Sequence, residues 1–282
     1  MTKIVDICKY RDEIISLWHK CFGDSEEYIT FFLDNCPDIV CVGFFDNDHL
    51  VSMLFLLEGF INCEKCKYLY AACTDTSHRR LGIMEKLIRF SESYCKINNY
   101  SSIFLVPADE DLYSYYAKFG FIASFYKKHI KLNVCDNYSC EIKTCKDIHE
   151  ICSIKLDLIN GISGFTFTKD LIEYTVREHL FNGGSVSKYH YGNNIALFFY
   201  YKENNTIIIK EMLSDFEIES ETIIKLFSNN DVENIYIYSP IVYNSADIGE
   251  EYTKCGMCLP LNEKTFDYIT QNSNLYAGMY LD

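Results

Sequence analysis

The sequence contains few prolines and glycines and no long apolar stretch. There are 4 prolines and 13 glycines among 282 residues, which excludes long disordered linkers rich in either residue. The longest apolar run, residues 50–60, is far shorter than a membrane-spanning helix requires, and the N-terminus lacks the charged-then-apolar pattern of a signal peptide. We therefore expect a cytoplasmic protein without a membrane partner, whose 14 cysteines are reduced.

Positive charge is also scarce. Lys and Arg total 26 against 40 Asp and Glu, which gives a formal net charge of −14. This balance argues against a nucleic-acid partner, because binding to nucleic acid requires a cationic surface. It suits a cationic small substrate, and it suits plain solubility equally well. With 49% hydrophobic residues, the chain can form one large core or two modest ones, and its length favours two domains. No motif fixes the oligomeric state.

Two CxxC pairs have the spacing of zinc ligands. They are Cys63/Cys66 and Cys255/Cys258, which lie far apart in the sequence. Cys63 and Cys66 flank a predicted turn, and Cys255 takes an apolar position in the repeat described below. We therefore expect structural thiols and no metal.

Apolar periodicity predicts an α+β domain in the first half of the chain. Ser25 has the residue type of a helix N-cap, and Gly23 that of a helix end. The order of the predicted elements favours one sheet with a helix packed behind it. Predicted helices cover residues 11–23, 25–35, 82–97 and 111–120, and predicted strands cover residues 39–45, 50–61, 67–74, 101–107 and 123–132.

The segment between the strand that ends at Thr74 and the helix that begins near Gly82 has the properties of a phosphate-binding loop. A helix N-terminus offers unpaired N–H groups and a partial positive charge, and a glycine allows close approach to the backbone. Arg79 and Arg80 oppose the helix dipole, which is easier to explain if an anion is their neighbour. A solvated basic helix start is the competing interpretation. The segment matches neither GxxxxGK[ST] nor GxGxxG.

Two motifs resemble the GNAT superfamily of acetyl-CoA-dependent N-acyltransferases. Residues 79–84, Arg-Arg-Leu-Gly-Ile-Met, resemble the family's Arg/Gln-x-x-Gly-x-Gly/Ala motif, although Met84 replaces a small residue. Residues 116–121, Tyr-Ala-Lys-Phe-Gly-Phe, resemble its Tyr-x-Lys-x-Gly-Phe signature. The similarity covers about residues 1–131 and looks closest to tandem-domain proteins of the enhanced intracellular survival type.

The resemblance implies a coenzyme A site and a set of residues around it. Backbone amides of the loop would hold the pyrophosphate, the strand before it would hold the acetyl and pantetheine groups, and Asp109 replaces the family's usual Asn. The implied acetyl-CoA contacts are Ala72, Cys73, Thr74, Arg79, Arg80, Leu81, Gly82, Ile83, Met84 and Asp109.

The resemblance also implies direct transfer of the acetyl group to an amine, with Tyr116 as the general acid near the sulfur. A thiol nucleophile at Cys73 is disfavoured, because the family transfers directly. For the general base, Glu58 is a candidate, and Asp24, Glu26 and Glu27 lie where acceptor-binding helices run in the family. The acceptor is expected to be an amine of a small molecule or peptide, and a cationic acceptor suits the acidic chain.

The second half repeats the pattern of the first without close identity. A hairpin over residues 193–215 is followed by a helix over 219–228 and a strand over 234–239, and residues 252–257 mirror residues 116–121. In this alignment Arg79 corresponds to Glu219 and Gly82 to Thr222, so that glutamates replace the phosphate-binding residues.

This pattern predicts a tandem GNAT fold with a mostly antiparallel central sheet flanked by helices. Residues 1–131 would form the domain with the acetyl-CoA site. Residues 132–282 would form a GNAT-like domain without the phosphate loop, connected through a linker at about 132–147. Three aromatic side chains of the second half are expected to line the acceptor cleft: Phe165, Phe167 and Tyr174.

Two other function classes compete with an N-acetyltransferase. A non-catalytic CoA-binding sensor or interaction module would keep Arg79 and Gly82 without needing Tyr116. An aminoacyl-tRNA-dependent ligase with tandem GNAT-like domains would need a basic tRNA-binding surface, which the acidic composition disfavours.

Overall fold

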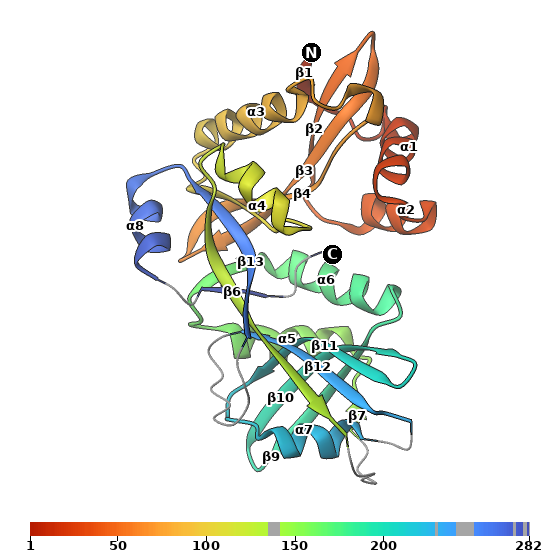
Figure 1. The fold of residues 1–282 in the computed structure, drawn as a ribbon, viewed down its shortest axis with the longest axis vertical. Helices are drawn as coiled ribbons and strands as arrows, with labels where there is room; N and C mark the ends of the chain where they lie inside the picture. The colour runs from red at the N-terminus through yellow and green to blue at the C-terminus, as the bar shows by residue number, and fades with distance from the viewer. Residues whose placement is uncertain (135–141, 229–230, 241–250, 273–274, 279–280, 282) are drawn as a thin grey trace. The chain divides into compact units, whose positions relative to one another are not determined.

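The computed structural model describes residues 1–134, 142–228, 231–240, 251–272, 275–278 and 281 (Figure 1). The chain forms two compact units. Unit 1 comprises residues 1–124, 165–171 and 256–272, and unit 2 comprises residues 125–164, 172–255 and 273–282. The expected single division after residue 131 therefore differs from the observed one, because several segments pass from one unit to the other. Part of the expected linker, residues 135–141, lies outside the described residues.

Unit 1 is built on a mostly antiparallel sheet with the order β1-β2-β3-β4-β5-β13. Among the strand pairs described for this unit, β4 and β5 are parallel. Its strands are β1 (Thr2–Ile4), β2 (Val40–Asp46), β3 (His49–Ile61), β4 (Glu64–Thr74), β5 (Ser102–Leu105) and β13 (Glu251–Pro260), with β8 (Gly164–Phe167) paired to the end of β3. Its helices are α1 (Arg11–Phe22), α2 (Glu26–Asn35), α3 (Ile83–Ile97), α4 (Glu110–Ala117) and α8 (Glu263–Gln271).

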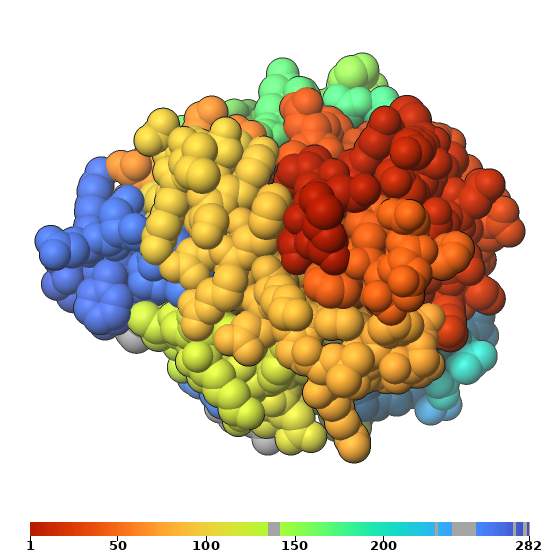
Figure 2. All heavy atoms as spheres, turned by 90° about the horizontal axis from the view of Figure 1, so that it is seen from above, coloured from red at the N-terminus to blue at the C-terminus, as the bar shows by residue number. Residues whose placement is uncertain are grey.

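Helices cover both faces of this sheet (Figure 1). On one face, Trp18 of α1 and Phe32 of α2 pack on Phe55 of β3. On the other, the neighbouring residues of β3, Leu54 and Leu56, join a core with α3 and α4. Alternate side chains of a strand point to opposite faces, which explains why β3 is apolar along most of its length. Figure 2 shows α3 in yellow on one face of unit 1, beside β1 in dark red.

Unit 2 contains a sheet with the order β6-β12-β11-β10-β9-β7. Its β11 and β12 pair in parallel, as β4 and β5 do in unit 1. The strands are β6 (Ile122–Asn133), β7 (Lys143–Thr144), β9 (Ser185–Tyr191), β10 (Asn194–Glu203), β11 (Thr206–Ser214), β12 (Asn234–Pro240) and β14 (Tyr276–Ala277). The helices are α5 (Ile148–Ile159), α7 (Ser220–Phe227) and α6 (Lys169–Phe181), which begins in unit 1.

The two sheets exchange strands. From the first half of the chain, β6 pairs antiparallel with β12 in unit 2 over residues 127–133. From the second half, β13 pairs antiparallel with β5 in unit 1 over residues 257–260. Each sheet is therefore completed by a strand from the other half of the sequence.

Two details of the predicted repeat are wrong. Residues 252–257 belong to strand β13 and not to the end of a helix, because β13 extends a sheet and pairs with β5 from Met257 to Pro260. In addition, Glu219 is the N-cap of α7 and Gly82 the N-cap of α3. Glu219 therefore corresponds to Gly82 and not to Arg79, and the second loop is shorter than the first.

Candidate active site

A cavity opens in unit 1 where β4 and β5 separate. The two strands pair only from Cys66 to Tyr68 of β4, although β4 continues to Thr74. A bulge interrupts the pairing between β3 and β4, and beside it Ala71 has a φ of 48°, which is uncommon for a residue other than glycine. A bulge bends its strand, and the free end of β4 forms one wall of a cavity of about 630 Å³.

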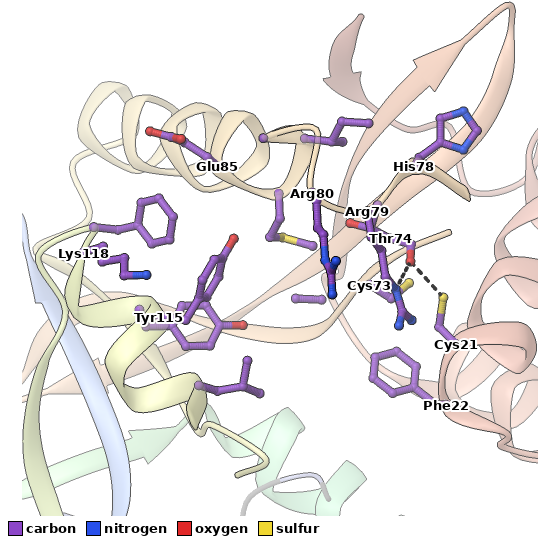
Figure 3. Close-up of a pocket in the computed structure, with 17 residues that line it drawn as sticks. Cys21, Phe22, Cys73, Thr74, His78, Arg79, Arg80, Glu85, Tyr115 and Lys118 are labelled. Carbon is purple, nitrogen blue, oxygen red and sulfur yellow. Dashed lines mark hydrogen bonds between the residues drawn. The ribbon is translucent and has the colours of Figure 1, made fainter. Parts of the chain in front are cut away.

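The cavity brings together most of the residues predicted from the two motifs (Figure 3). The predicted residues that line it are Ala72, Cys73, Thr74, Arg79, Arg80, Gly82, Ile83, Met84 and Tyr116. Sequence reasoning missed Cys21, Phe22, His78, Glu85, Leu112, Tyr115, Lys118 and Phe119. Cys21 and Phe22 end α1, which reaches this wall only through tertiary packing, so no spacing in the sequence could have identified them.

Asp75 organises the start of the loop between β4 and α3. Its carboxylate accepts hydrogen bonds from the Ser77 N–H at 2.9 Å and the Ser77 hydroxyl at 2.7 Å. It also pairs with the Lys20 ammonium at 2.6 Å, which joins the loop to α1. These interactions, with Lys20 contributing most, hold the pKa of Asp75 well below its usual range. The loop is thus held in place from its first residue.

The end of the loop has a backbone conformation suited to an anion. Arg80 has a φ of 64° and Gly82 a φ of 71°. Left-handed residues in tight loops turn successive N–H groups toward one side, which is the geometry of anion-binding concavities. A Cβ built on Gly82 would meet no atom within 4 Å. The space beside this backbone is therefore open to a ligand.

Helix α3 begins without a side-chain cap. Gly82 is its N-cap and provides no acceptor, and the backbone N–H of Lys86, bonded to the Gly82 carbonyl at 3.3 Å, is the first to gain a helical partner. The N–H groups of Ile83, Met84 and Glu85 precede it. Asp109, in contrast, caps α4 by accepting from the Leu112 N–H at 2.9 Å. The unpaired amides and the dipole of α3 are suited to an anionic group such as a phosphate.

Three cations line the cavity of this acidic protein. They are Arg79, Arg80 and Lys118, against a single lining carboxylate, Glu85. Arg79 donates from Nε to the Thr74 carbonyl at 3.1 Å, and no ion pair involves any of the three among the described residues. The local charge is therefore the reverse of the average charge of the chain, and it favours an anionic ligand.

Tyr116 lies at the end of α4 with its side chain 8% exposed. Its ring packs edge-on against Tyr115 and Phe121, with ring centroids 5.3 Å and 5.6 Å away. Burial raises the pKa of the hydroxyl well above its usual value, and the nearby Tyr115 and Asp109 add to this effect. No hydrogen bond to this hydroxyl is found in the described part of the chain. At neutral pH the group is thus a protonated donor at the cavity wall.

Three predicted site residues do not line the cavity. Asp109 is engaged as the cap of α4, and the side chain of Leu81 is 63% exposed, so that only its backbone belongs to the loop. Glu58 is opposite Lys67 of β4 in the sheet. Lys67 precedes Cys73 by six residues, which is about 20 Å along a regular strand at about 3.3 Å per residue. Glu58 therefore lies outside the lining of this cavity, and its role as a general base stays a prediction.

Glu58 instead balances two lysines. It lies 3.3 Å from the Lys65 ammonium and 3.5 Å from that of Lys67, and it accepts from the Tyr100 hydroxyl at 3.1 Å. Although burial opposes the effect, these partners lower the pKa of Glu58 below its usual value. A carboxylate stabilised in its charged form is a weak proton acceptor, which also argues against the expected role.

The other expected acceptor residues also lie elsewhere. Phe165 stacks on Phe104 with a centroid distance of 4.3 Å, Phe167 packs on Tyr68, and Tyr174 is buried in unit 2. Phe165 and Phe167 form hydrophobic core because their strand, β8, pairs with the end of β3, and Tyr174 lies on α6.

The three acidic residues after α1 do not line the cavity. Asp24 accepts a hydrogen bond from the Trp18 indole N–H at 2.7 Å, and Glu26 and Glu27 are exposed in the first turn of α2. Their position favours the helix dipole of α2 and gives them no contact with this site.

No group of three metal-ligating side chains is present among the described residues. Cys63 is exposed at the turn between β3 and β4, whereas Cys66, Cys255 and Cys258 are buried. In the described part of the chain, no helix is both long and apolar enough to cross a membrane.

Comparison with known proteins agrees with this architecture. The family model of the acetyltransferase (GNAT) domain matches residues 9–123. Among solved structures, a probable N-acyltransferase from Enterococcus faecalis V583 is similar with a TM-score of 0.71 and 11% identity, over 94% of this chain and 74% of that one. Eis1 from Mycobacterium abscessus is similar with a TM-score of 0.64 and 7% identity, over 93% of this chain and 74% of that one.

A tandem GNAT protein from the clavulanic acid biosynthesis pathway is also similar, with a TM-score of 0.53 and 10% identity, over 93% of this chain and 99% of that one. No curated protein matches the chain significantly. The fold is thus that of tandem GNAT proteins. Residues 9–123 form a GNAT acetyltransferase domain.

Proposed function

We propose that the chain transfers an acetyl group from acetyl-CoA to an amine of a small molecule or peptide, by direct attack of the amine on the thioester. The observation that carries this proposal is one cavity of unit 1, which is lined both by the uncapped, cationic start of α3 and by the protonated Tyr116. The first feature suits a diphosphate. The second suits a departing thiolate, which needs a proton.

The loop and β4 would orient the donor. Backbone amides at the start of α3 would hold the diphosphate, with Arg79 and Arg80 beside it. The exposed edge of β4 at Ala72 and Cys73 offers strand-like hydrogen bonds to the pantetheine arm, because β5 does not pair with this part of β4. This placement confines the thioester between β4 and α4 and positions it for attack.

Lys118, the lining cation that the diphosphate would not neutralise, also affects the acceptor. It disfavours another positive charge in the cavity, so it favours the neutral, nucleophilic form of an amine. The amine then needs no strong general base, and its proton passes to water after attack. Glu58 is then not needed as a general base.

Replacement of Tyr116 by Phe tests the proposed acid. We expect Tyr116→Phe to lower kcat by about 100-fold or more, the usual effect of losing a general acid, while CoA binding measured by calorimetry stays unchanged. Tyr115→Phe is the matched control, since Tyr115 lies on the same helix and lines the same cavity. Acetylation would be followed by mass spectrometry on a panel of polyamines, aminoglycosides and peptide amines.

The outcomes separate the candidate functions. Equal loss in the two variants would remove Tyr116 from the proposed role. CoA binding without acetylation of any amine in the panel, by wild-type protein, would instead favour a non-catalytic CoA-binding module. Failure to bind CoA at all would overturn the assignment of the cavity.

A further inference from the structure

Two cysteines face each other in the wall of the cavity. Cys21 lies in the last turn of α1 and Cys73 near the end of β4, and both line the cavity (Figure 3). Both thiols are free, with Cys21 partly exposed and Cys73 buried. The last turn of α1 and the end of β4 bring the two side chains to the same part of the wall. Cys21 Sγ also donates to the Thr74 carbonyl at 3.6 Å.

The two thiols differ in reactivity. The neighbouring Cys73 thiol, helped by Arg79, lowers the pKa of Cys21 to about 7, although burial acts in the opposite direction. The neighbouring Cys21 thiol and burial raise the pKa of Cys73 well above its usual value. A partly exposed thiol with a low pKa beside a second, protonated thiol is the arrangement of an attacking and a resolving cysteine.

We propose that Cys21 and Cys73 form a redox-active dithiol that reacts with low-molecular-weight disulfides such as oxidised glutathione. The Cys21 thiolate attacks one sulfur of the disulfide, which forms a mixed disulfide and releases one glutathione thiolate. Cys73 then loses its proton to water and attacks Cys21 Sγ, which forms the Cys21–Cys73 disulfide and releases the second glutathione. The two cysteines lose two electrons, and one glutathione disulfide gains them.

The position of the pair links this chemistry to the ligand of the cavity. A glutathionyl group on Cys21 would occupy the same space as the pantetheine arm, so the mixed disulfide and bound CoA should exclude each other. This consequence rests on the proposed function, whereas the exchange reaction depends only on the two thiols.

Peptide mapping tests the dithiol directly. Folded wild-type protein would be incubated with oxidised glutathione at pH 7, quenched with an alkylating reagent and digested without reduction. We expect a linked peptide pair that contains Cys21 and Cys73. We also expect Cys21 to react about threefold faster than the exposed Cys8 and Cys63. A thiol with a low pKa is more often ionised at pH 7, and this gain outweighs the lower intrinsic nucleophilicity of its thiolate.

Single variants identify the two roles. Cys73→Ser should stop at the mixed disulfide on Cys21, Cys21→Ser should abolish the linked pair, and Cys66→Ala, on the same strand, should leave it intact. The proposal would be overturned if wild-type protein gave no linked pair. It would also be overturned if Cys21→Ser protein still gave a linked pair in which another cysteine is joined to Cys73.

A separate arm tests the link to CoA with desulfo-CoA, which lacks a thiol. Saturating desulfo-CoA should slow modification of Cys21 about tenfold or more, and Cys73→Ser protein carrying glutathione on Cys21 should lose CoA binding. If the linked pair forms but desulfo-CoA gives no protection, the dithiol stands and the assignment of this cavity to CoA fails. If CoA binds but no linked pair forms, only the dithiol fails.

Discussion

The proposed phosphate-binding role of the loop makes a sharp prediction at Gly82. Its φ of 71° and ψ of 15° lie in the left-handed region, and a Cβ there would meet no atom within 4 Å. Asn and Asp are the residues other than glycine that best tolerate this conformation. Gly82→Asn and Gly82→Asp should therefore both fold, and they differ from each other by one negative charge.

That charge should affect folding and binding in opposite directions. At the N-terminus of α3, the carboxylate of Gly82→Asp is favourable by about 0.3–1 kcal/mol relative to Gly82→Asn. Against a diphosphate with two negative charges about 6 Å away, it is unfavourable by about 1.4 kcal/mol in water and by about 5 kcal/mol at an effective dielectric constant of about 20. The smaller value already corresponds to about a tenfold loss of affinity.

The assay is a paired measurement on the two variants. Thermal unfolding without ligand should show Gly82→Asp at least as stable as Gly82→Asn, and calorimetry with CoA should show it binding at least about tenfold more weakly. Equal CoA affinity of the two variants would refute the placement of the diphosphate at this helix start. A parallel fall in stability and affinity would show that Asp acts by distorting the loop.

Three further predictions concern charged or ionisable groups. Arg80→Gln should weaken CoA binding about tenfold at low salt and by less at high salt, as calorimetry at two ionic strengths would show, because screening weakens the contribution of an exposed charge. Glu58→Gln should leave the acetylation rate unchanged. Denaturant unfolding of this variant should show a free energy of unfolding lower by about 1–3 kcal/mol, because the buried Lys67 loses its counter-charge. A large loss of kcat in a folded variant would restore Glu58 as a base. The Cys21 thiolate should form as pH rises through about 7, so the rate of its alkylation by iodoacetamide should rise with that midpoint. Arg79→Gln should move the midpoint upward. A midpoint near that of ordinary thiols, about 8.5, would contradict the stabilisation of the thiolate by Cys73 and Arg79.

Local features of the fold could be predicted from the sequence because each depends on few neighbouring residues. Gly23 ends α1 in the left-handed conformation, and the Ser25 hydroxyl caps α2, as expected. The turn at Asn62 and Cys63, both with positive φ, joins β3 to β4 at the predicted place. The start of α3 at Gly82 follows from the same kind of local signal.

Strand exchange could not be predicted in this way. Residues 252–257 resemble the end of α4 in spacing, with a glycine at the matching position, yet they form β13. Pairing of β13 with β5 joins residues about 150 positions apart, and no local preference encodes such a partner. The same limitation applies to Cys21, which reaches Cys73 only because α1 packs on β4. The position of Glu58 depends on the direction and register of β3, which place it beside Lys67 and away from the open end of β4.

The second unit shows what the loop of the first unit requires. Between β4 and α3 the loop has eight residues, 75–82, whereas between β11 and α7 it has five, 215–219. The shorter loop approaches its helix through Glu219, whose φ of −68° is extended and whose side chain makes no cap. It therefore lacks the left-handed residue that opens the backbone in unit 1, and it places glutamates at positions 217, 219 and 221 around the helix start. Carboxylates at a helix start satisfy the helix dipole and repel phosphate. We therefore infer that, of these two similar strand–loop–helix junctions, the one between β4 and α3 is suited to bind an anion and the one between β11 and α7 is not.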